Sequence, residues 1–204
     1  MEMKENRFAR NVIVADADYI DRVAFNLIVN FERMLGRRIP QADMARWVEC
    51  VALDSGLRQR DDQEVQVVLV HDSESKSLEN FVPSSYGEQL DGQAFKGPLG
   101  EFTFCCVTTE GLASTESLFC DTVEMVARQE TVHRLMMVPG DLYMNNVRAR
   151  LRNIDDDRLR ATLFSMQPVA TGGLLRMEML GYSLMQALGI RADEINDNLE
   201  QQNL

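Results

Sequence analysis

The chain has 204 residues, of which 45% are hydrophobic and 26% charged, and its 32 acidic and 21 basic residues give a formal net charge of −11. This composition is typical of a globular protein of one domain, and it excludes a largely disordered chain, a collagen-like repeat and a disulfide-stapled miniprotein. It also argues against a protein that coats nucleic acid, because such proteins need a dense field of Lys and Arg.

The first quarter of the chain predicts a strand followed by two helices. The short β-branched run at 11–15 is typical of a strand buried on both faces, and it stops at Asp16. Apolar residues then recur at helical spacing from Asp18, the expected N-cap, to Leu35. A second helix is expected over about 42–53.

The middle of the chain predicts two more strands and a helix. The run at 64–71 is a second buried strand and again ends at a carboxylate, Asp72. Residues 73–100 are the least regular stretch and are interpreted as a long connection, which in a compact domain often has a function. A third strand is expected at 102–107 and an amphipathic helix at 114–128.

The last third predicts two strands and two helices. A fourth strand at 133–138 leads through Pro139 and Gly140 to Asp141 and a helix that ends near Arg152. A fifth strand is expected at 161–166 and a final helix at 174–188.

The predicted final helix is apolar on nearly every side. Such a helix is buried on more than one face, either beneath the polar tail that follows it or in a subunit interface. We therefore expect a homodimer that is formed through residues 174–188.

Five strands that alternate with helices indicate an α/β fold: a single three-layer α/β/α domain with a largely parallel five-stranded sheet. The domain is expected to span 11–190, with an N-terminal extension at 1–10 and a polar C-terminal tail at 191–204.

The sequence predicts a cytoplasmic protein without a membrane segment. No run reaches the roughly 18 to 20 continuous apolar residues that a bilayer span needs, and the polar N-terminus does not resemble a secretory signal. The four cysteines form no Cys-x-x-Cys pair, so reduced thiols are expected rather than a zinc site or disulfides.

Four aspartates directly follow predicted strands: Asp16, Asp18, Asp72 and Asp141. Ligand sites of open parallel sheets lie beyond the carboxyl ends of the strands, where the strand order reverses. If the order is 3-2-1-4-5, the first and fourth strands are neighbours, and Asp16 converges on Asp141. Such carboxylates could bind Mg²⁺ or Mn²⁺ and support phosphoester hydrolysis. The alternative is structural, since Asp18 and Asp141 each precede a helix and could simply cap it.

Two motifs resemble those of PIN-like nucleases, especially their NYN branch. The sequence NVIVADADY leads from a strand into Asp-x-Asp and a long helix, and RLMMVPGDLYMNNV resembles the later strand with its Ser-Gly-Asp-x-Asp-Phe type signature. The resemblance covers roughly 11–190 and implies a ribonuclease whose metal is held by Asp16, Asp18 and Asp141.

The chain departs from the family pattern at three positions of the two motifs. Tyr143 stands where the family has its second aspartate, Pro139 replaces the serine, and Tyr19 or Ile20 replaces the polar Asn that often follows the Asp pair. Two readings therefore stay open: a metal-dependent nuclease with an incomplete acidic site, and a catalytically inactive binding or assembly module.

A lesser alternative is the haloacid-dehalogenase-like phosphatases, which the same Asp-x-Asp opening also resembles. That resemblance implies Asp16 as the nucleophile, Asp18 as the acid/base and Asp141 as a magnesium ligand. Position 145 is Asn rather than the family's Asp, and the immediate start of the helix leaves no room for the hairpin of those enzymes.

A group of arginines follows the fourth strand: Arg148, Arg150, Arg152, Arg158 and Arg160. They could form a ridge that contacts RNA or a nucleotide. Because Asp155, Asp156 and Asp157 lie among them, we interpret the region as a salt-bridged surface.

Overall fold

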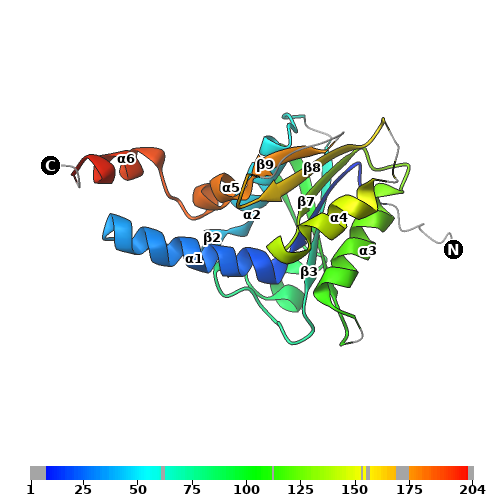
Figure 1. Cartoon of the computed structure of the whole chain (residues 1–204), viewed down its shortest axis with the longest axis horizontal. Coiled ribbons are helices and arrows are strands. Elements are labelled where there is room, and N and C mark those ends of the chain that lie inside the picture. The colour runs from blue at the N-terminus through cyan, green and yellow to red at the C-terminus, as the bar shows by residue number, and fades with distance from the viewer. Residues whose placement is uncertain are drawn as a thin grey trace.

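The computed structural model describes residues 8–60, 63–111, 113–152, 154, 157–168 and 175–201 (Figure 1). Most of the predicted N-terminal extension, the pair Asp155-Asp156 and Leu174 at the predicted start of the final helix lie outside these residues.

The sheet contains all five predicted strands, and they are parallel. They are β1 (Asn11–Asp16), β3 (Glu64–His71), β6 (Gly100–Thr108), β7 (Arg134–Val138) and β8 (Arg160–Ser165). Their spatial order, β6-β3-β1-β7-β8, is the order 3-2-1-4-5. The α/β class and the largely parallel sheet are thus confirmed.

The predicted number of five strands is wrong, because the described part of the chain already forms a sheet of seven strands in the order β5-β6-β3-β1-β7-β8-β9. At one edge, β5 (Ala94–Gly97) pairs with β6 in an antiparallel hairpin. At the other edge, β9 (Arg176–Met179) pairs with β8 in parallel. Edge strands bury less apolar surface than central ones, so their sequences lack the continuous apolar run that marks β1 and β3.

The strand β9 corrects the predicted helix at 174–188, of which only the second half is helical, as α5 (Leu180–Ala187). Residues 175–179 alternate apolar and charged side chains, and Leu175 and Met177 pack against one core cluster. The predicted helix at 174–188 was apolar on nearly every side because its pattern included these strand residues. The homodimer expected through residues 174–188 therefore loses its support from a helix without a polar face.

Helices cover both faces of the sheet (Figure 1). One face packs against α1 (Ala17–Leu35), α2 (Met44–Asp54) and α5, and the other against α3 (Thr115–Ala127) and α4 (Met144–Leu151). Alternate residues of each strand enter the two clusters: Ile13 and Ala15 contribute to the first, and Val12 and Val14 to the second. The sheet is therefore buried on both sides, as the apolar strands predict.

The irregular connection contains short elements rather than a bare loop. It holds β4 (Phe81–Val82), which pairs with β2 (Ala42–Asp43), then the π-helical turn η1 (Tyr86–Leu90), and then β5. Leu78, Phe81 and Tyr86 are buried, so this segment belongs to the core on the α1 side.

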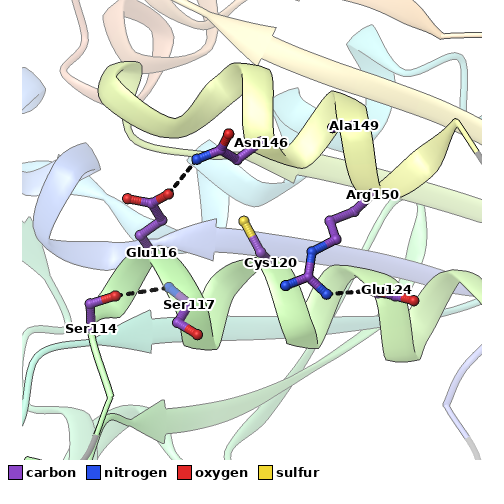
Figure 2. Close-up of a pocket in the computed structure, with 8 residues that line it drawn as sticks. All are labelled: Ser114, Glu116, Ser117, Cys120, Glu124, Asn146, Ala149 and Arg150. Carbon is purple, nitrogen blue, oxygen red and sulfur yellow. Dashed lines mark hydrogen bonds and ion pairs between the residues drawn. The ribbon is translucent and has the colours of Figure 1, made fainter.

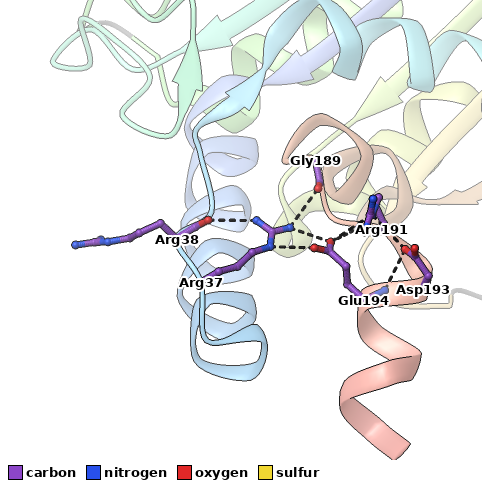
Figure 3. A network of polar contacts seen from close by, with 6 residues as sticks. All are labelled: Arg37, Arg38, Gly189, Arg191, Asp193 and Glu194. Atoms are coloured by element: carbon purple, nitrogen blue, oxygen red, sulfur yellow. Dashed lines mark hydrogen bonds and ion pairs between the residues drawn. The ribbon is translucent and has the colours of Figure 1, made fainter.

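The polar tail forms a sixth helix, α6 (Ala192–Gln201), tied to the end of α1 (Figure 3). The Arg37 guanidinium donates to both carboxylate oxygens of Glu194, at 3.0 and 2.9 Å. Arg37 also donates to the carbonyl of Gly189, so one side chain links the end of α1 to the turn before α6. Where the structure describes the chain, no helix is long and apolar enough to cross a membrane.

Candidate functional site

The strand order reverses between β1 and β7, and the two aspartates predicted to converge lie there. Asp16 is the last residue of β1, and Asp141 opens the 3-10 turn η2 (Asp141–Tyr143) after β7. Since β1 pairs with β7 in parallel, their carboxyl ends reach the same edge of the sheet.

Asp16 uses both carboxylate oxygens for hydrogen bonds within the protein. It is the N-cap of α1, because its Oδ1 accepts the backbone N–H of Tyr19 at 2.9 Å. Its Oδ2 accepts the hydroxyl of Tyr143. The residue is only 6% exposed, and burial raises the pKa of its carboxyl above the ordinary 3.8 despite these bonds.

Asp141 accepts a hydrogen bond from a tyrosine of the opposite segment. The hydroxyl of Tyr19 in α1 donates to its Oδ1 at 2.7 Å. Tyr19 is 2% exposed, and burial together with this bond raises its pKa. Each segment thus supplies one carboxylate and one tyrosine, and we call Asp16, Tyr19, Asp141 and Tyr143 the crossed tyrosine–aspartate network.

The other two predicted aspartates form a separate contact. Asp18 Oδ2 accepts the backbone N–H of Asp72 at 2.7 Å, and Asp72 Oδ1 accepts that of Glu74 at 2.9 Å. The caps expected from the sequence are also corrected: Asp16 rather than Asp18 caps α1, and Gly140 rather than Asp141 precedes η2. In the described ranges, no three Asp, Glu, His or Cys side chains are placed to hold a metal ion together.

Sequence reasoning noted Tyr19 and Tyr143 only as departures from a family pattern, whereas the structure makes them partners of the carboxylates. The glycine before Asp141, Gly140, is a sequence feature that could have indicated this close packing. A Cβ built on it would lie 2.8 Å from the Tyr143 ring and 3.1 Å from Asp16 Oδ2. A side chain there would therefore force the network apart.

His71 and Tyr86 form a second pair near this edge that no sequence pattern indicated. Their rings stack with centroids 3.9 Å apart and planes 8° apart, and both residues are buried. The His71 Nδ1 lies 2.9 Å from the carbonyl of Asp72. The pair joins the end of β3 to the irregular connection, which explains why that segment is well packed.

The raised pKa of Asp16 predicts a pH dependence of stability. Its folded-state pKa lies above the unfolded one, so its contribution is fully present below the unfolded pKa and is lost as the pH rises through the folded value. Relative to an Asp16→Asn variant, which does not titrate there, the wild type should gain stability as the pH falls from about 7 to about 4. Urea unfolding of both proteins across this range would measure it, and a constant difference would contradict the prediction.

A groove of about 520 Å³ separates α3 from α4 (Figure 2). Arg150 pairs with Glu124 at 2.7 Å and with Asp121 at 3.2 Å, and Asn146 donates to Glu116 at 2.5 Å. The hydrogen bonds that Arg128 and Arg150 donate to Glu124 lower the pKa of the Glu124 carboxyl. For Arg150, the interpretation as a salt-bridged surface is confirmed.

The structure defines an α/β protein with a parallel-sheet core and two hydrogen-bonded aspartates at the reversal of strand order. The chain belongs to a family of unknown function, DUF6621, whose model matches residues 5–195. No curated protein and no solved structure matches the chain.

Proposed function

We propose that this chain is a catalytically inactive binding module that resembles the PIN-like NYN nucleases in plan but has a metal position closed by tyrosines. The observation that supports this proposal is the crossed tyrosine–aspartate network, in which hydroxyl groups occupy carboxylate oxygens that a cation would need.

The physical reason is that a cation and the hydrogen-bond donors compete for the same carboxylate oxygens. Two neighbouring carboxylates repel each other unless a cation, a proton or hydrogen-bond donors compensate them. Here Tyr143 and Tyr19 donate to them, and the N–H of Tyr19 occupies the second oxygen of Asp16. Mg²⁺ demands near-octahedral oxygen coordination, so it would have to compete with these buried donors for the carboxylate oxygens.

The convergence of Asp16 and Asp141 also favours a second candidate, a Mg²⁺- or Mn²⁺-dependent phosphoesterase of NYN type. In that case the two tyrosines would turn away when the metal binds. The phosphatase alternative has less support, because an Asp16 nucleophile needs a free oxygen and both of its oxygens accept hydrogen bonds.

A manganese titration separates the two candidates. For the binding module, about 5 mM Mn²⁺ should shift the Tm of the wild type by less than about 1 °C, since a cation stabilises a protein only by binding the folded state. The protein should also leave single-stranded RNA intact. A Tm that rises by several degrees in the wild type but not in an Asp16→Asn variant would overturn the proposal in favour of the nuclease.

The same network predicts the effect of Tyr143→Phe. Loss of the buried hydroxyl leaves Asp16 Oδ2 without its donor, so the free energy of unfolding should fall by about 2 kcal/mol. Tyr182→Phe is the matched control, because Tyr182 is 66% exposed and should change stability by less than about 0.5 kcal/mol. Equal stability of both variants in urea unfolding would show that the Tyr143 bond contributes nothing.

Three further expectations remain predictions: the cytoplasmic location, an RNA or nucleotide partner, and the homodimer through 174–188. For the dimer, the remaining support is that the described sheet ends at β9, since the open side of an edge strand can pair with a second chain.

A further inference from the structure

A set of arginines gathers at the amino edge of the sheet, opposite the crossed tyrosine–aspartate network. Arg134 begins β7 and lies in register with Arg160, which begins β8. Arg176 begins β9 beside Thr162, two residues further along β8. Residues in register on parallel strands, and residues two apart on one strand, project from the same face. The three side chains therefore share the face that α2 covers.

The loop after α2 brings these guanidinium groups together. Arg134 donates to the carbonyl of Ser55, at the C-terminus of α2. A Cβ built on Gly56 would lie 3.3 Å from Nη1 of Arg176 and 3.7 Å from Nη1 of Arg134. Both groups thus lie beneath the same glycine, where a larger residue would crowd them.

The arginines line a pocket of about 650 Å³ at this edge. Those that line it are Arg10, Arg58, Arg60, Arg134, Arg158 and Arg160. Glu64 and Asp157 are the described acids in the lining, and a neighbouring pocket of about 440 Å³ shares Arg134 and Arg160 and adds Arg176. Arg176 is paired with Glu178. The described lining therefore carries a clear excess of positive charge.

The electrostatics of Arg134 reflect this excess. Burial lowers the pKa of its guanidinium, and the positive charges of Arg160 and Arg176 lower it further. Throughout the described residues, the side chain of Arg160 forms no ion pair or hydrogen bond. Positive groups that repel one another around a cavity are stabilised when an anion enters it.

We propose that this amino-edge pocket binds a compact anion with two or more phosphate groups, such as a nucleoside diphosphate. Guanidinium groups bind phosphate oxygens in pairs, and the pocket has the size of a small-molecule site. The net charge of −11 favours a small anion over a long one, because the rest of the surface repels an extended polyanion. This site lies at the other edge of the sheet, so the proposal does not depend on the proposed function.

Isothermal titration calorimetry with pyrophosphate and with ADP tests the proposal, at about 50 mM salt and with EDTA to exclude metal effects. Both anions should bind the wild type. Arg160→Gln should weaken binding about tenfold, because it removes one charged partner of the phosphates. Arg38→Gln, which removes the same charge from a side chain that is 95% exposed, should change the affinity less than about twofold.

The comparison of ligands identifies what is recognised. Equal affinity for pyrophosphate and ADP would mean that the phosphates alone are bound, and tighter ADP binding would add the nucleoside; both support the proposal. Thermal unfolding of Arg160→Gln should match the wild type, because this side chain has no described partner to lose.

Three results would overturn the proposal that the amino-edge pocket binds a compact anion. If neither anion binds, the pocket is not an anion site. An equal loss of affinity in Arg38→Gln would indicate a general charge effect. Tighter binding of a ten-nucleotide RNA than of ADP would indicate a nucleic-acid surface rather than a pocket for a compact anion.

Discussion

Asp16→Ala is expected to lower the free energy of unfolding by about 3 kcal/mol. About 1 kcal/mol of this loss comes from the N-cap of α1, where Asp16 accepts the N–H of Tyr19. The remainder comes from the Tyr143 hydroxyl, which is buried and would lose its acceptor. Urea unfolding at neutral pH measures the change, and at this chain length it corresponds to a drop in Tm of several degrees.

Asp16→Asn is the matched control for this prediction. Asparagine is an equally good N-cap, and its amide can contact Tyr143 without a buried charge, so the loss should stay below about 1 kcal/mol. If the asparagine variant is as unstable as the alanine variant, the negative charge itself is needed at the site. That result would strengthen the case for a cation there.

Gly100→Ala is expected to cost about 3 kcal/mol or more. Gly100 begins β6 with a φ of +127°, a conformation that residues with a side chain rarely adopt. A Cβ on it would lie 2.1 Å from the backbone carbonyl oxygen of Gln63, which the N–H of Glu101 holds at 2.8 Å. Because the obstacle is backbone, it cannot swing aside, and β6 would have to move away from residue 63.

Gly87→Ala is the matched control, since a Cβ there meets no atom within 4 Å and the residue is exposed. It should leave the denaturant midpoint nearly unchanged. A Gly100→Ala variant as stable as Gly87→Ala would contradict the close approach of β6 to Gln63. Loss of stability in both variants would point instead to a general intolerance of the 86–104 region.

The central fold followed from local patterns. The five buried strands could be predicted because parallel strands covered on both faces need continuous apolar runs, and β1 and β3 have them. Their order 3-2-1-4-5 entered the sequence argument only as an assumption, and the structure supplied it. The helix α1 was equally predictable, because its apolar residues recur at helical spacing. The edge strands β5 and β9 were missed, because each is only four residues long without a continuous apolar run, and β9 runs directly into α5.

Only part of the candidate site could be predicted from the sequence. Asp16 and Asp141 both lie at the carboxyl edge of the sheet, as expected of aspartates that follow parallel strands, and Tyr19 and Tyr143 link them there. Their hydrogen-bond donors were not predictable, because Tyr19 reaches Asp141 across 122 residues of sequence and Tyr143 reaches Asp16 across 127. No local sequence pattern specifies which distant hydroxyl donates a hydrogen bond to a given carboxylate.

The amino-acid order alone therefore indicated the strands, their burial and the edge at which acids collect, since these depend on periodicity within a few residues. Only the tertiary structure showed that tyrosine hydroxyls donate to those aspartates. It also showed that Arg134 and Arg176 lie beneath Gly56, with Arg160 in register beside Arg134. Such groups come from strands far apart in the chain, and strand pairing alone brings them together. The overall charge of −11 had argued against polyanion binding, but the fold concentrates positive charge in one pocket that composition cannot reveal.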